Sequence, residues 1–293
     1  RIAKPRATAH CSSAQKNNVM PFVGRKGQPR LHYLIDDFTD PWADAPVVLL
    51  QHGNGRSAKF WYQWVPALAR HYRVVRPDMR GLGESGRNFD LATDLTEEHC
   101  VADLVAIIQD LGMDQVHFVG ESSGGIIGLG LAALHPQLIR TLTIAATPVY
   151  ISDKMKASYA LKHGSRTDAM RDMGIRKWVD TTNRSTRFPP ETEEGFFNWY
   201  ADEFAKGDIE VLLRLVQLVN DANALQWLPK VQCPVLGLYP TGGPITDAEQ
   251  ERLLTANLKN FKLVHLPTQY HMVHHIVPEA CTAELLKFLA QHP

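Results

Sequence analysis

The sequence predicts an α/β fold in which helices flank a mostly parallel central sheet. Short apolar runs alternate along the chain with segments whose apolar residues recur at helical spacing. Residues 47–51 carry almost no polarity, as expected of a strand buried on both faces of a parallel sheet. Residues 116–135 are predicted as a strand, a tight turn and a small, apolar helix. Strands that alternate with helices in this way place their helices on both faces of the sheet.

The individual elements follow in chain order from the same pattern. We expect a helix over 57–70 that Ser57 caps, and a second helix over 96–111 with its apolar residues on one face. Residues 261–266 alternate in polarity like an edge strand, and a last helix covers 278–291. The strands are expected at 47–51, 72–76, 116–119, 142–146, 235–239 and 261–266.

The turn at residues 120–124 has the sequence Gly-Glu-Ser-Ser-Gly, which matches the pattern G-x-S-x-G. A serine on such a turn between a strand and a helix is pushed above the sheet edge, with its hydroxyl clear of its own backbone. The flanking glycines are needed because the neighbouring helix and strand pass too close for a Cβ. The pattern therefore predicts Ser122 as a nucleophile.

Three other segments accompany this turn in order: the His52-Gly53 loop, residues 78–85 (D-x-R-G-x-G-x-S) and a late histidine. Together the four segments resemble the α/β-hydrolase superfamily, and the resemblance covers the chain from about residue 31 onward. It implies that the backbone N–H groups of Asn54 and Ser123 form an oxyanion hole. It gives residues 78–85 a structural role, in which the aspartate and the arginine brace the loop.

The same resemblance places the catalytic histidine. In the family this residue follows a strand and stands seven residues before a proline that starts the last helix, which selects His271 with Pro278. A neutral serine hydroxyl is a poor nucleophile, so an imidazole must take its proton and later return it to the leaving group. His274 and His275 lie on the following turn and are expected to be structural.

The sequence departs from the family at the acid of the catalytic triad. Gly243 stands where the family carries an aspartate after the seventh strand, and the alternative position after the sixth strand has no carboxylate either. The acid is therefore unknown. Asp153, Asp221 and Asp247 are the candidates for a relocated acid, although Asp247 is also interpreted as a residue at the start of a helix. The chain thus has a Ser–His dyad, an acid recruited from elsewhere, or no catalytic activity.

The chain divides into three parts. Residues 1–30 are predicted to be a basic N-terminal extension, because residues 1–35 contain seven Lys or Arg and no acid. Residues 31–147 and 230–293 are predicted to form the α/β-hydrolase core. Residues 148–229, which the sheet does not need, are expected to form a helical lid that shapes the substrate pocket.

Composition limits the possible partners. Lys+Arg and Asp+Glu both total 31, so no global charge attracts nucleic acid. The longest apolar run, 124–134, is too short for a membrane span of roughly 20 residues. Four scattered cysteines show no metal or disulfide spacing, which indicates a reducing compartment such as the cytoplasm. We expect no metal or other cofactor and a small-molecule substrate; the oligomeric state is open.

These observations predict a serine hydrolase that cleaves a carboxylic ester or lactone of a small, largely apolar substrate. Ser122 attacks, His271 acts as the base, and an acyl-enzyme forms on Ser122. Two alternatives stay open. One is a carbon–carbon bond hydrolase of a β-diketone or ring-cleavage product; the other is a non-catalytic ligand-binding homologue, because Gly243 replaces the usual acid.

Overall fold

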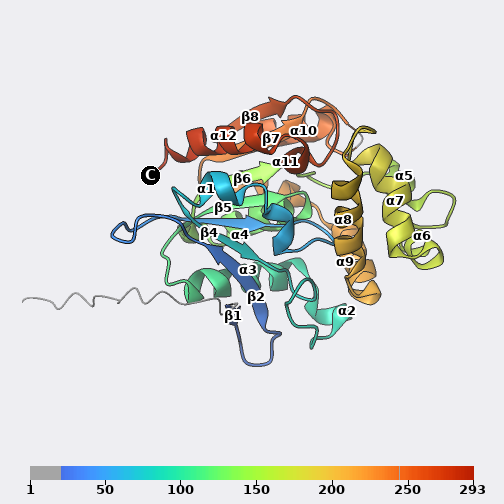
Figure 1. The fold of residues 1–293 in the computed structure, drawn as a ribbon, viewed down its shortest axis with the longest axis horizontal. Coiled ribbons are helices and arrows are strands. Elements are labelled where there is room, and N and C mark those ends of the chain that lie inside the picture. The colour runs from blue at the N-terminus through green and yellow to red at the C-terminus, as the bar shows by residue number, and fades with distance from the viewer. Residues whose placement is uncertain (1–20, 244) are drawn as a thin grey trace, which may run out of the picture.

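A computed structural model describes residues 21–243 and 245–293. Eight strands form one sheet in the order β1-β2-β4-β3-β5-β6-β7-β8 (Figure 1). The strands from β4 to β8 along this order are parallel to one another. At one edge, β2 pairs antiparallel with β4, and β1 pairs antiparallel with β2. The expected mostly parallel sheet flanked by helices is therefore confirmed.

The six predicted strands are present, with bounds within three residues of those expected, and β1 and β2 are two strands that the sequence pattern did not predict. The strands are β1 Phe22–Val23, β2 Leu31–Asp36, β3 Val47–Gln51, β4 Arg73–Pro77, β5 Val116–Glu121, β6 Ile139–Ala145, β7 Val235–Pro240 and β8 Phe261–Leu266. The helices are α1 Val65–Leu68, α2 Leu91–Asp94, α3 Glu97–Asp110, α4 Ser123–Leu134, α5 Asp153–Ala160, α6 Arg166–Met173, α7 Ile175–Thr186, α8 Glu194–Ala205, α9 Ile209–Asp221, α10 Ala248–Asn257, α11 Val273–Ile276 and α12 Pro278–Leu289. None of these helices is both long and apolar enough to cross a membrane.

The sheet is covered on both faces, as its apolar strands require. Along β3, Val47 and Leu49 belong to one hydrophobic cluster, whereas Val48 and Leu50 belong to the other. Successive side chains of a strand point to opposite faces, so this alternation shows that each cluster packs on its own side of the sheet. The two cores hold β3 and β5 next to each other in the middle of the sheet.

Five helices, α5 to α9, are inserted between β6 and β7. They lie together at one end of the sheet, where the yellow and olive ribbons stack in Figure 1. Most aromatic side chains of this insertion are buried and pack inside it, among them Trp178, Phe197, Tyr200 and Phe204. The insertion contacts the sheet domain near the chain's end, because the backbone N–H of Met272 donates to the carbonyl of Arg187 at 3.2 Å.

Two sequence-based expectations are wrong in detail. The sheet domain begins before residue 31, because β1 pairs with β2 through Phe22↔His32 and Val23↔Leu31; residues 1–20 of the expected extension lie outside the described residues. The helix expected over 57–70 is instead a short 3₁₀ helix, Ala58–Trp61, followed by α1. Pro66 explains this break, since proline is accepted only in the first turn of a helix and ends any helix that precedes it.

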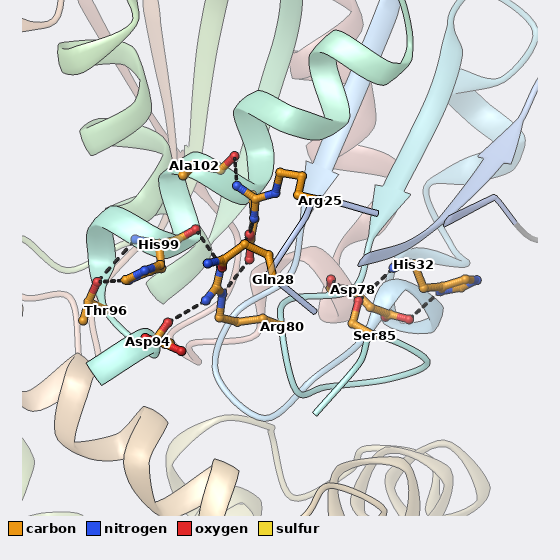
Figure 2. Close-up of polar contacts among 11 residues, drawn as sticks. Arg25, Gln28, His32, Asp78, Arg80, Ser85, Asp94, Thr96, His99 and Ala102 are labelled. Atoms are coloured by element: carbon orange, nitrogen blue, oxygen red, sulfur yellow. Dashed lines mark hydrogen bonds and ion pairs between the residues drawn. The ribbon is translucent and has the colours of Figure 1, made fainter. Parts of the chain in front are cut away.

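Residues 78–85 have the structural role that the resemblance implied. Asp78 accepts hydrogen bonds from the backbone N–H groups of Ala58, at 2.6 Å, and Glu84, at 3.0 Å, and its carboxylate lies 2.6 Å from Nδ1 of His32. The fully buried Arg80 pairs with Asp103 through two hydrogen bonds of 2.6 and 2.7 Å. Figure 2 shows the contact between Asp78 and His32, and the hydrogen bonds that hold Arg80. They fix the loop after β4 to the remainder of the sheet domain.

Removing the partner of Arg80 should strongly destabilise the fold. In Asp103→Ala the guanidinium stays buried without a counter-charge, so we expect a loss of ~3–5 kcal/mol in the free energy of unfolding, measured by urea denaturation. The matched control is Glu249→Ala, which removes an exposed partner of Arg252 and should leave stability unchanged. Equal stability of the two variants would contradict a bracing role for this ion pair.

Candidate functional site

Ser122 occupies a strained turn between β5 and α4. Its backbone has φ 52° and ψ −121°, a conformation that non-glycine residues rarely adopt. The glycines around it are required by close contacts: a Cβ on Gly120 would lie 2.5 Å from the carbonyl oxygen of Gly124, and one on Gly124 would lie 2.6 Å from that of Gln51. The turn is also tied to β6, because the N–H of Ser122 donates to Ala145 at 2.9 Å.

The structure brings Ser122 and His271 together across 149 residues of sequence. Nε2 of His271 lies 3.1 Å from Oγ of Ser122, within hydrogen-bonding distance. His271 lies in the loop between β8 and α11, as the pattern predicted. Both residues are largely shielded, with exposed fractions of 8% for Ser122 and 2% for His271. The pair has the geometry that a nucleophile and its base need.

The expected oxyanion donors lie in two segments that the sheet brings together, the loop after β3 and the turn after β5. Because β3 and β5 are neighbours in the sheet, the loop after β3 is held beside the turn at Ser122. Among the described residues, the backbone N–H groups of Asn54 and Ser123 donate to no other group, so both are free for a ligand. Asn54 is itself buried. Two unpaired N–H donors beside a serine hydroxyl can hold a developing negative charge on a substrate oxygen.

A buried ion pair that the sequence reasoning missed joins these two loops. Glu121, which directly precedes the nucleophile, forms hydrogen bonds of 2.5 to 3.0 Å with the guanidinium of Arg56 and accepts the N–H of Gly53 at 3.1 Å. Its Oε1 also lies 3.8 Å from Nε2 of His271. The signal was present in the sequence, because Glu121 is a charged residue between the short apolar run at 118–119 and the predicted nucleophile Ser122.

The position of the missing acid lies beside the histidine loop but holds no carboxylate. A Cβ on Gly243 would lie 2.7 Å from the carbonyl oxygen of Gln269, two residues before His271. The backbone of Gly243 has φ +129°, so an aspartate there would be strained as well as crowded. Within the described part of the chain, Nδ1 of His271 is buried and has no hydrogen-bond partner. In the described structure, Ser122 and His271 therefore lie in contact, and no carboxylate contacts Nδ1 of His271.

None of the three relocated-acid candidates contacts His271. Asp247 caps α10 by accepting the N–H of Gln250 at 3.2 Å, as its alternative interpretation stated. Asp153 begins α5 with a fully exposed side chain, and Asp221 is an exposed residue at the end of α9. The geometry therefore favours the dyad over the relocated acid.

The neighbouring histidines have structural contacts. Trp64 donates from its indole nitrogen to the carbonyl of His274 at 2.9 Å, and Nδ1 of His275 lies 2.7 Å from the side-chain oxygen of Gln63. No group of three or more His, Cys, Asp or Glu side chains among residues 21–243 and 245–293 could hold a metal ion. Both histidines help to fix α11 directly after His271.

Burial keeps His271 neutral. It lowers the pKa of the imidazole well below its ordinary value, and the nearby positive charge of Arg187 lowers the pKa further, although Glu121 counteracts this in part. A neutral imidazole can accept the proton of Ser122 at neutral pH. Burial likewise lowers the pKa of His52, His274 and His275.

We expect the turn at Ser122 to tolerate no side chain at Gly124. Gly124→Ala would force a methyl group against two backbone carbonyls of the loop after β3, so folding or activity should be lost. Gly130→Ala is the matched control in the same helix, because the nearest atom to its Cβ would lie at 3.5 Å. This variant should gain up to ~1 kcal/mol of stability, since alanine favours a helix over glycine. The melting temperature and the catalytic activity of both variants test this expectation.

The buried histidines should make stability depend on pH. Their pKa values are lower in the folded protein than in the unfolded chain, so only the unfolded chain gains protons as the pH falls below about 6.5. The free energy of unfolding should therefore be lower at about pH 5.5 than at about pH 7.5 in urea titrations. His275→Gln should reduce the difference, and equal stability at the two pH values would argue against neutral burial.

The known proteins that this chain resembles agree with the fold and the serine turn described above. A family model described as the alpha/beta hydrolase fold matches residues 46–276. The chain is 36% identical over 248 residues to a protein of Stutzerimonas stutzeri (strain A1501) named "Putative carbamate hydrolase RutD", covering 80% of this chain and 88% of that protein. It is 24% identical over 267 residues to the (E)-2-((N-methylformamido)methylene)succinate hydrolase of Acinetobacter baylyi, covering 85% and 91% of the two chains.

A solved structure shows the same fold over nearly the full length. The enol-lactonase from Burkholderia xenovorans LB400 superposes with a TM-score of 0.80 at 25% sequence identity, covering 92% of this chain and 100% of that one. The family model covers most of the chain, and the sheet order and the strained serine turn agree with it. The chain therefore belongs to the α/β-hydrolase fold family of hydrolases.

Proposed function

We propose that this protein is a serine hydrolase that cleaves a carboxylic ester or lactone through an acyl-enzyme on Ser122. The observation that carries the proposal is the 3.1 Å contact between Oγ of Ser122 and Nε2 of His271 at a strained strand-to-helix turn. Strain of this kind persists only where the surrounding structure enforces it, and it is typical of functional sites. An intact nucleophile–base contact supports an enzyme over a non-catalytic binding protein.

The proposed reaction has two steps. His271 takes the hydroxyl proton at Nε2 while Oγ of Ser122 attacks the carbonyl carbon, and the N–H groups of Asn54 and Ser123 bind the resulting oxyanion. The carbon–oxygen bond then breaks, and the imidazolium gives its proton to the leaving alkoxide. Water repeats the sequence on the acyl-enzyme, with His271 again as the base, and releases the acid and free Ser122.

Without an acid beside His271, other groups must take over the roles of that acid. In a triad the acid holds the imidazole in one tautomer and stabilises its charged form, and the loss of the acid costs ~10⁴ in rate. Glu121, at 3.8 Å from Nε2 of His271, can stabilise the charged form. It cannot hold the tautomer, because Nδ1 points elsewhere and has no partner in the described structure. We therefore propose that Glu121 supplies the electrostatic part of the acid's role alone.

A second candidate reaction is the hydrolysis of a carbamate. The name of the 36% identical relative supports it, and the attack by Ser122 on a carbamate carbonyl would use the same oxyanion donors. The leaving group would then be an amine or an alcohol that receives its proton from His271. A panel of small esters, lactones and carbamates separates the two candidates by their kcat/KM values.

Ser122→Ala should abolish both labelling by a fluorophosphonate probe and turnover. We expect kcat for the best ester, lactone or carbamate to fall by at least ~10³, because only the oxyanion hole and substrate binding would contribute. Ser158→Ala, which changes an exposed hydroxyl on α5, is the control and should retain both. Binding without turnover across the panel, or labelling of another serine, would contradict the proposal.

A further inference from the structure

Two buried arginines of the insertion form no ion pair in the described structure. The buried charged side chains among the described residues are Arg56, Arg76, Asp78, Arg80, Asp103, Glu121, Arg166 and Arg187. Arg56 pairs with Glu121, Arg76 with Asp36 and Arg80 with Asp103, and Asp78 lies 2.6 Å from Nδ1 of His32. Arg166 and Arg187 have no such partner in the described structure, which sets them apart from every other buried charge.

Arg187 lies next to the catalytic histidine. It follows the last residue of α7, and its carbonyl accepts the N–H of Met272, the residue after His271, at 3.2 Å. The residue is 5% exposed; within the described part of the chain, Nη1 donates to the sulfur of Met272 at 3.8 Å, and Nε has no partner. The Nε–H group of Arg187 is therefore available to a ligand, in a guanidinium whose five N–H donors form a planar fork.

Arg166 adds a second positive charge to the same region. It is the first residue of α6 and is 7% exposed, and its Nε and Nη2 have no hydrogen-bond partner. Its guanidinium carbon lies 4.8 Å from the ring centres of both Tyr159 and Trp178, and that of Arg187 lies 5.4 Å from the same tyrosine ring. The aromatic faces offset part of the cost of burial, but they supply no negative charge. The two cations gather around one ring without an anion.

The charge balance of the site is consequently positive. Arg56 forms an ion pair with Glu121, whose negative charge also stabilises the charged form of Arg187 from beyond ion-pair distance. The buried histidines of the site are held neutral, so one carboxylate faces the three guanidinium groups of Arg56, Arg166 and Arg187. Burying a charge is costly unless a partner compensates it. A planar guanidinium matches the two oxygens of a carboxylate through parallel hydrogen bonds. A bound carboxylate would supply the missing charge and fill the free donors.

We infer that Arg187, assisted by Arg166, forms a subsite that binds a carboxylate of the substrate while the scissile carbonyl lies at Ser122. The substrate class is thus a half-ester of a dicarboxylic acid, or a lactone that bears a carboxylate. This inference rests on the proposed function only for the bond that is cleaved. It replaces the expectation of a largely apolar substrate, because an apolar ligand would leave both guanidinium groups buried and unpaired.

Matched substrates test the subsite through catalysis. We would compare monoethyl esters of glutaric, adipic and suberic acid with neutral ethyl esters of the same acyl length, following acid release at constant pH. The parent protein should have the higher kcat/KM for at least one half-ester. In Arg187→Gln the ratio of the two kcat/KM values should fall by about 100-fold, mainly through KM, since a buried charge pair is lost.

Arg184→Gln is the control for this experiment. Arg184 lies on the same helix, is exposed and pairs with Glu194, so the variant should keep the parent's preference for the half-ester. A parent protein that prefers the neutral esters at every length would overturn the inference. So would an Arg187→Gln variant with the parent's ratio.

Binding without turnover separates this inference from the proposed reaction. Adipate and glutarate would be titrated into Ser122→Ala by calorimetry, with adipamide as the neutral comparison. We expect the dianions to bind, adipamide not to bind, and Arg187→Gln in the same background to abolish the binding. This result without any turnover by the parent would reject the proposed hydrolase reaction and keep the subsite. Turnover of neutral esters without dianion binding would support the proposed hydrolase reaction and overturn the carboxylate subsite.

Stability gives a readout that a structural arginine would not produce. Because Arg187 forms no ion pair in the described structure, the apolar variant Arg187→Met should melt at a temperature no lower than the parent's. It should at the same time lose the preference for half-esters. A lower melting temperature together with an unchanged preference would show that Arg187 only supports the insertion, and would overturn the inference.

Discussion

The ion pair between Arg56 and Glu121 is the contact on which the site depends. It joins the loop after β3 to the end of β5, and the same carboxylate accepts the N–H of Gly53 and faces His271. The carboxylate of Glu121 is fully buried. Removal of either partner would leave an unpaired buried charge and lower the free energy of unfolding by ~3–5 kcal/mol. The pair thus fixes the position of Asn54 relative to Ser122 and places a negative charge beside the base.

The absence of an acid at Gly243 follows from the local backbone. The residue has φ +129° and its missing Cβ faces the carbonyl of Gln269, so the loop has adapted to a glycine. His271 is oriented instead by its packing and by the hydrogen bond between Met272 and Arg187. The insertion and α11 therefore fix the position of His271, and the carboxylate of Glu121 lies 3.8 Å from its Nε2.

The positive charges near the site come from the insertion, and the negative charge comes from the sheet. Glu121 lies beneath the nucleophile at the end of β5, whereas Arg166 and Arg187 come from α6 and the end of α7. A substrate with a carboxylate would place its charged end toward the insertion and its scissile carbonyl toward the sheet. Such an arrangement orients the reacting carbon by binding energy from a part of the substrate that does not react.

Local patterns in the sequence determined the fold class, the strands from β3 to β8, the serine turn and the histidine at position 271. Each of these depends on residues close together in the chain: apolar periodicity, the glycines around Ser122, and the spacing from His271 to Pro278. The tertiary structure alone decided that residues 22–23 join the sheet, that Glu121 pairs with Arg56, and that Arg187 lies beside the catalytic loop. These contacts join residues that are far apart in sequence, and packing, which periodicity does not encode, brings them together.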